Sequence, residues 1–197
     1  MAAWGCPNVY YKLFMLLTSK REKDEALVYH LNKIDDWVVY GSVGFRCRTR
    51  KDRIKSLFFK LIRALERGNK GEFVVRFEGD NRTRERHFHF LMAQEGLVTK
   101  ELNSINALLN KRIKDLSYLI DEKGDYLYPE LKSCSPKLVK YDPSLGAKGY
   151  ISKKADDEVE RLEGKGLDSC VDGYDWKMSP SLRKRIKNIN TLDISHY

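Results

Sequence analysis

The sequence predicts an α+β fold, in which β-strands form a sheet and helices with one apolar face pack beside it. Two segments repeat apolar residues at helical spacing, over 54–65 and 102–120. Short segments rich in β-branched and aromatic residues are typical of strands, and a polar loop over 79–86 separates two of them as in an antiparallel hairpin. The predicted strands cover 10–17, 37–45, 72–78 and 87–92.

The N-terminal part contains two of these strands. The run over 10–17 ends at Thr18-Ser19, and the charged residues 21–35 could form a short helix. In the second strand, Gly41 and Gly44 indicate bends or bulges, because glycine in a strand interior often marks such irregularities.

The first strong helix follows this strand. Thr49 can cap it, Asp52 lies three residues on, and Gly68 closes it. Ten basic and only two acidic residues lie between Arg46 and Lys70. The excess is what contact with phosphates requires, although a charged run can equally be a solvated helix face. The expected phosphate contacts are Arg48, Arg50, Lys51 and Arg53.

A second helix is predicted over about 99–120, followed by loop-like residues 121–136 and a short strand over 138–141. Asp142-Pro143 is a favourable helix start, and a buried helical face continues to Leu162. Beyond Gly164 the periodicity is lost, and Lys177 to Lys187 contains five basic residues and no acid. We therefore predict one domain over 1–165 and a basic extension over 166–197 that can pack on the same domain.

Composition narrows the class of protein. A formal net charge of +9 implies a polyanionic partner, either nucleic acid or an acidic membrane. The four cysteines contain no C-x-x-C pair, which argues against a zinc ribbon or a disulfide framework. No apolar stretch is long enough to span a bilayer. We expect an intracellular protein that does not enter membranes.

The segment whose residue types indicate a functional site is His87-Phe88-His89-Phe90. Alternate side chains of a strand point to opposite faces, so the two histidines share one face and the two phenylalanines the other. Imidazoles about 7 Å apart along a strand can meet one metal ion. The competing interpretation is a pair of ordinary histidines on the polar face of a half-buried strand.

The preceding strand adds a carboxylate. If residues 79–86 close an antiparallel hairpin, Glu78 lies opposite His87, and cross-strand partners share a face. Glu78, His87 and His89 then gather away from the apolar side chains. This ligand set suits Mn²⁺ or Mg²⁺ for phosphate chemistry, and imidazole also admits Zn²⁺, Co²⁺ or Ni²⁺.

A second candidate element is Gly149-Tyr150-Ile151-Ser152-Lys153. On a helix Tyr150, Lys153 and Asp157 lie along one stripe. A phenolate can attack a phosphodiester, and an ammonium one turn away can stabilise the charge on the phosphate. Tyr174 and Lys177 show the same spacing, but in a stretch without helical periodicity.

His-hydrophobic-His on a strand, followed roughly 60 residues later by Tyr-x-x-Lys on a helix, resembles the HUH endonucleases. Among these the pattern is most similar to the Rep proteins that start rolling-circle replication of phages, plasmids and single-stranded DNA viruses. The resemblance implies a central antiparallel sheet, related to that of RRM domains, with the two-histidine strand in the middle. It spans about residues 10–160.

The resemblance also implies roles. His87 and His89, with Glu78 as third ligand, would bind the metal, Tyr150 would be the nucleophile, Lys153 would position the phosphate, and Lys154 would contact DNA. The enzyme would nick single-stranded DNA or an origin hairpin and retain a 5′-phosphotyrosine. Gly146 and Lys154 occupy the positions four residues before and after Tyr150, as expected of a single-tyrosine member.

The family resemblance, together with a motif that the sequence lacks, also predicts the partners. The sequence contains no G-x-x-x-x-G-K-[ST], so a separate helicase and a polymerase are expected. Such a protein acts in the cytoplasm of a prokaryotic host of a phage or plasmid, or in the host nucleus for a eukaryotic virus. The alternatives are an HUH-type transposase and a non-catalytic, basic nucleic-acid-binding module.

Overall fold

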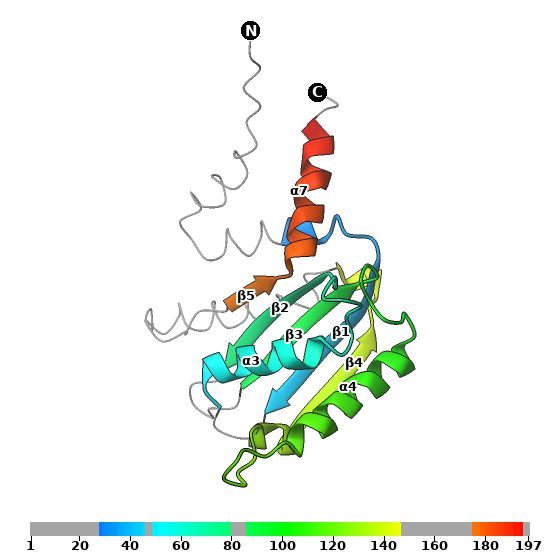
Figure 1. Ribbon diagram of the computed structural model, residues 1–197. Helices are drawn as coiled ribbons and strands as arrows, with labels where there is room; N and C mark the ends of the chain where they lie inside the picture. Colours follow the sequence, from blue (N-terminus) through cyan, green and yellow to red (C-terminus); the bar gives the residue numbers. More distant parts are fainter. Residues whose placement is uncertain (1–27, 46–48, 80–85, 147–174, 195–197) are drawn as a thin grey trace, which may run out of the picture.

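A computed structural model describes residues 28–45, 49–79, 86–146 and 175–194 of the chain. Its centre is a five-stranded antiparallel sheet with the strand order β4-β1-β3-β2-β5 (Figure 1). The strands are β1 (Trp37–Phe45), β2 (Phe73–Gly79), β3 (Arg86–Ala93), β4 (Cys134–Lys140) and β5 (Asp175–Met178). The α+β class is confirmed, and the two-histidine strand β3 is the middle strand.

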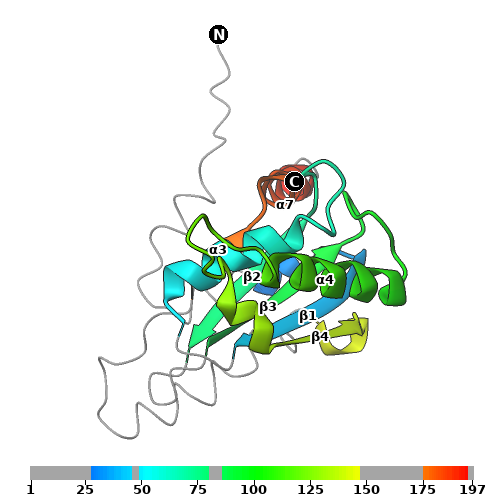
Figure 2. The same ribbon diagram turned by 60° about the horizontal axis from the view of Figure 1, so that its bottom comes forward.

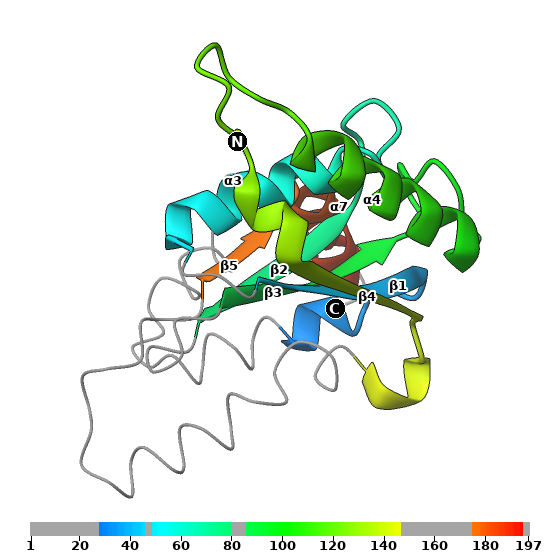
Figure 3. The same ribbon diagram turned by 90° about the horizontal axis from the view of Figure 1, so that it is seen from below.

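Two helices cover one face of this sheet (Figures 2 and 3). They are α3 (Lys51–Ile62) and α4 (Leu102–Ser117), and the short 3₁₀ helices η1 (Pro129–Ser133) and η2 (Pro143–Leu145) flank β4. The described part of the chain contains no helix that is long and apolar enough to cross a membrane.

The larger core lies between the sheet and these two helices. Phe58 of α3 is fully buried at its centre, where its ring contacts four phenylalanines of β2 and β3 at centroid distances of 5.1 to 5.9 Å. Burial of such aromatic side chains is a dominant stabilising contribution to a core. The four partners are Phe73, Phe77, Phe88 and Phe90.

A smaller core lies on the opposite face of the sheet, toward one end of the strands. It joins the helical residues 28–31 to helix α7 (Pro180–Ile194) through buried Leu31, Trp37 and Leu182. Trp37 belongs to this face because the pairing of β1 with β3 shifts between Trp37 and Val39. A β-bulge of this kind inserts one extra residue and re-aims the side chain before it.

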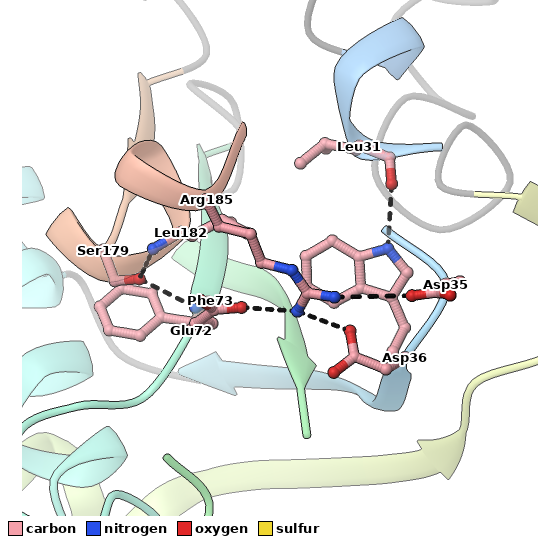
Figure 4. Close-up of polar contacts among 9 residues, drawn as sticks. Leu31, Asp35, Asp36, Glu72, Phe73, Ser179, Leu182 and Arg185 are labelled. Carbon is pink, nitrogen blue, oxygen red and sulfur yellow. Dashed lines mark hydrogen bonds and ion pairs between the residues drawn. The ribbon is translucent and has the colours of Figure 1, made fainter. Parts of the chain in front are cut away.

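An ion-pair cluster fastens α7 to this end of the sheet (Figure 4). Arg185 Nη1 lies 2.8 Å from a carboxylate oxygen of Asp36 and 2.8 Å from one of Glu72. Ser179 Oγ accepts hydrogen bonds from the backbone N–H groups of Phe73 and Leu182, so it caps α7 and ties it to β2. The C-terminal helix therefore packs on the same structural unit as the sheet.

Several local predictions were wrong. The N-cap position of α3 is occupied by Arg50, in an extended conformation and without a side-chain cap hydrogen bond, and not by Thr49, which is buried. Gly41 and Gly44 pair regularly with β3, and the bulge lies earlier in the strand. Gly41 is needed because a Cβ there would overlap the ring of Phe90. Residues 175–194, expected to lack periodic structure, form β5 and α7.

The other predicted elements are close to the observed ones. Helix α4 is shorter at both ends than predicted, and β4 begins four residues before the predicted strand. Asp142 starts a helical turn as expected, since its carboxylate accepts a hydrogen bond from the Ser144 N–H. The predicted strand over 10–17 and the helix around Tyr150 lie outside the described residues.

Candidate metal centre and nucleic-acid interface

The two histidines of β3 share the face of the sheet that α3 and α4 leave uncovered. Phe88 and Phe90 are 1 % exposed in the main core, whereas His87 and His89 on the other face are only partly buried. The imidazole centroids lie 4.9 Å apart, with the ring planes at 83° to each other. The alternation of strand side chains has therefore placed the two rings next to one another, close enough for a shared cation.

The register of β2 against β3 brings Glu78 to this pair. Glu78 is the Cα partner of His87, and Arg76 is the partner of His89. The hairpin register predicted from the sequence is confirmed. The structure describes only the backbone of Glu78, so the role of its side chain as a metal ligand stays a prediction. The side chains that the structure describes contain no group of three His, Cys, Asp or Glu that could hold a metal.

Tyr40 of β1 is a member of the site that the sequence did not indicate. Its hydroxyl lies 2.5 Å from Nδ1 of His89, and the two rings are nearly parallel, with centroids 5.7 Å apart. The residue directly opposite His89 on β1 is Ser42, so Tyr40 reaches the imidazole along the diagonal. Aromatic side chains can span this diagonal distance between strands.

Two basic residues occupy the same cross-strand row as His89. Lys137 of β4 pairs with Ser42, Ser42 with His89, and His89 with Arg76 of β2. Arg76 is fully buried and Lys137 is exposed. Arg76 therefore lies on the strand next to β3, and Lys137 lies on a strand two positions from β3. The row thus contains one basic residue on each side of His89.

The basic helix α3 lies on the other face of the sheet, across the main core (Figures 2 and 3). Its first turn nevertheless follows closely on the end of β1 that pairs with His87, because Gly44 is the partner of His87. Arg50 is exposed and forms an ion pair with Asp52 at 3.0 Å.

Arg53 has a structural role that the sequence did not show. Its Nε lies 3.0 Å from Glu130, its guanidinium also donates to the Leu127 carbonyl oxygen, and it stacks 4.9 Å from the Tyr128 ring centroid. These contacts hold the segment before β4 against α3. Its predicted phosphate contact would have to form in addition to them.

The structure describes the remaining predicted site residues only in part or not at all. Tyr150, Lys153, Lys154 and Arg48 are outside the described residues, and of Lys51 only the backbone is described, in the first turn of α3. The structure thus brings together His87, His89 and the backbone of Glu78. The tyrosine and lysine roles remain predictions.

Comparisons of the chain with family models, with curated proteins and with solved structures find no match.

Proposed function

We propose that the protein is a metal-dependent endonuclease of the HUH Rep type that nicks single-stranded DNA at a replication origin and rejoins it. The observation that supports this most directly is the pair of adjacent imidazoles opposite Glu78 in the β2–β3 register. A purely structural histidine pair would not need a carboxylate at the paired position or a row of basic residues beside it.

The donor set fits a divalent cation. Two imidazoles and one carboxylate on one rigid sheet suit Mn²⁺, and Mg²⁺ is acceptable with water completing its shell. His87, His89 and Glu78 would hold the ion. When bound, it would supply Lewis-acid polarisation of the scissile phosphate.

The chain's own nucleophile in this proposal is Tyr150. Its phenolic oxygen forms a bond to phosphorus while the bond from phosphorus to the 3′-oxygen breaks. The phenol proton is released to solvent, and the departing oxygen takes up a proton to become a free 3′-OH. The product is a 5′-phosphotyrosine, with Lys153 positioned to stabilise the phosphate charge.

Rejoining follows from the same chemistry. The phosphotyrosine is a phosphodiester, as the DNA linkage was, so attack by a 3′-OH regenerates the strand without an added energy source. A free 3′-OH can also prime synthesis, which would require a polymerase and a separate helicase as partners.

A covalent-adduct assay tests this proposal. Random-sequence single-stranded DNA labelled at its 3′ end is incubated with the full chain and Mn²⁺, and adducts are separated on a denaturing gel. We expect an adduct that disappears with EDTA and in Tyr150→Phe, and that persists in the control Tyr118→Phe, because Tyr118 is a highly exposed residue after α4.

The other outcomes separate the alternatives. An adduct that survives Tyr150→Phe but not Tyr174→Phe moves the nucleophile to Tyr174. Binding of the DNA pool without any adduct, at every Mn²⁺ concentration, refutes the enzyme and leaves a basic binding module. Specific cleavage of transposon ends in place of an origin hairpin would reassign the same chemistry to a transposase.

A further inference from the structure

We infer that Tyr40 is a positioning residue that holds Nδ1 of His89 and thereby presents Nε2 of that ring to the divalent cation. The inference rests on the proposed metal site, and it concerns a residue outside the predicted ligand and nucleophile set. It assigns the coordinating nitrogen of His89 and the side chain that selects it.

The geometry of the pair is specific. Tyr40 Oη lies 2.5 Å from His89 Nδ1, which is a short hydrogen bond, and the ring planes differ by only 9°. Tyr40 also packs against the smaller core, and Leu91 of that core is its cross-strand partner on β3. The contact therefore involves a half-buried, laterally packed phenol rather than a mobile surface side chain.

This contact bears on which of the two imidazole nitrogens of His89 can bind the metal ion. A neutral imidazole has one N–H, and a metal binds the nitrogen that carries the lone pair. If Nδ1–H donates to the Tyr40 oxygen, the lone pair is on Nε2. Metal-binding histidines characteristically donate their other N–H to such a partner, which fixes both the tautomer and the ring orientation.

The same geometry argues against Tyr40 as the nucleophile. The two nitrogens lie on different edges of the five-membered ring, and the phenol occupies the Nδ1 edge. An ion bound at Nε2 is therefore separated from the Tyr40 oxygen by the imidazole itself. Tyr40 acts through His89, and attack on the phosphate is left to a tyrosine from another segment.

Mn²⁺ binding measured by calorimetry on the DNA-free full chain tests the inference. Tyr40→Phe keeps the ring and its packing but removes the hydroxyl. We expect a loss of about 10- to 100-fold in Mn²⁺ affinity, with no loss in the exposed control Tyr118→Phe. Unfolding curves of both variants check that the fold is retained.

A double-mutant cycle separates action through His89 from a general effect. In a His89→Ala background, Tyr40→Phe should have no further effect on Mn²⁺ affinity, whereas in a His87→Ala background the loss should persist. Nitrogen-15 NMR of the metal-free protein with neutral imidazoles should show His89 as the Nδ1–H tautomer. Tyr40→Phe should shift it toward the Nε2–H form.

The outcomes distinguish this inference from the proposed function. If Tyr40→Phe binds Mn²⁺ as the wild type does, or the cycle shows no coupling to His89, the inference is refuted, even when adduct formation at Tyr150 is intact in the gel assay. If the cycle and the tautomer shift appear but DNA is never cleaved, Tyr40 positions a metal site and the nuclease proposal fails. Loss of the adduct in Tyr40→Phe at saturating Mn²⁺ would overturn the positioning role.

Discussion

The ion-pair cluster at Arg185 allows a stability prediction with a definite magnitude. Arg185 Nη1 contacts both Asp36 and Glu72 at 2.8 Å, and the Glu72 side chain is only 6 % exposed. Substitution of Arg185 by alanine would leave this carboxylate buried without its cation. Breaking a fully buried pair in this way costs about 3–5 kcal/mol.

Solvent reduces that figure here. The Arg185 and Asp36 side chains are each 28 % exposed, so water can replace part of the lost interaction. The longer contact to Asp35, which is 92 % exposed, should contribute almost nothing. We therefore expect Arg185→Ala to lower the free energy of unfolding by about 2–3 kcal/mol, between the surface and buried limits.

Urea denaturation at neutral pH measures this change. The matched control is Lys184→Ala, because Lys184 is an exposed neighbour on α7 and should change stability by no more than about 0.5 kcal/mol. In a Glu72→Gln background, Arg185→Ala should cost clearly less, since the buried charge is then absent. A loss below about 1 kcal/mol, or an equal loss in both backgrounds, would refute the reasoning.

The pKa of Arg185 bears on the conditions for this experiment. Burial by itself would lower that pKa, but hydrogen bonds to Glu72 and Asp36 and their negative charge outweigh it and raise the pKa above the usual arginine value. A group with a raised pKa contributes its stabilisation below its unfolded pKa and loses it only as pH rises through the folded value. The guanidinium is therefore charged throughout the workable pH range, and its contribution is present at the neutral pH of the experiment.

Three further predictions concern packing, pH and DNA. Gly41→Ala should destabilise the fold by about 1–3 kcal/mol, because the new methyl group overlaps the Phe90 ring. Urea denaturation midpoints measure this loss, and Gly44→Ala is the control, because a Cβ at Gly44 meets open space. Burial raises the pKa of Glu66, although the charge of Arg63 opposes this shift. Ionisation of Glu66 in the folded protein therefore costs stability, and the loss develops as pH rises above the ordinary pKa of a glutamate. Glu66→Gln should then be more stable than the wild type at neutral pH and equal to it in acid, and thermal melts across pH that show no such convergence contradict this. Arg50→Ala should lower by about one the slope of log affinity for single-stranded DNA against log salt concentration. Fluorescence anisotropy at several salt concentrations measures this slope. An unchanged slope would show that this turn of α3 faces solvent.

The hairpin register was predictable from the sequence because it depends on local constraints alone. Phe77 and Phe88 must both enter the core, and alternation along each strand then fixes which residues face the other way. A shift by one residue would have buried His87 and exposed Phe88. Together with closure of the hairpin over residues 79–86, this gives the pairing of Glu78 with His87.

The C-terminal helix was missed although it carries a usable signal. Leu182, Ile186 and Ile189 recur at helical spacing, but the surrounding basic residues hide the pattern in a short window. Strand β5 is only four residues long, and its assignment depends on pairing with β2, about a hundred residues earlier. Such an edge strand is defined by its partner rather than by its own composition.

The sequence alone determined the strand that presents both histidines, the side-chain alternation that separates them from the phenylalanine core, and the net positive charge of the chain. Only the tertiary structure decided that Tyr40 meets His89, that Arg76 and Lys137 share its row, and that Arg53 is engaged by Glu130. The physical reason is distance along the chain. Periodicity fixes the direction of a side chain on its own strand, whereas a neighbour 49 residues away is determined by strand order and by the register of β1 against β3.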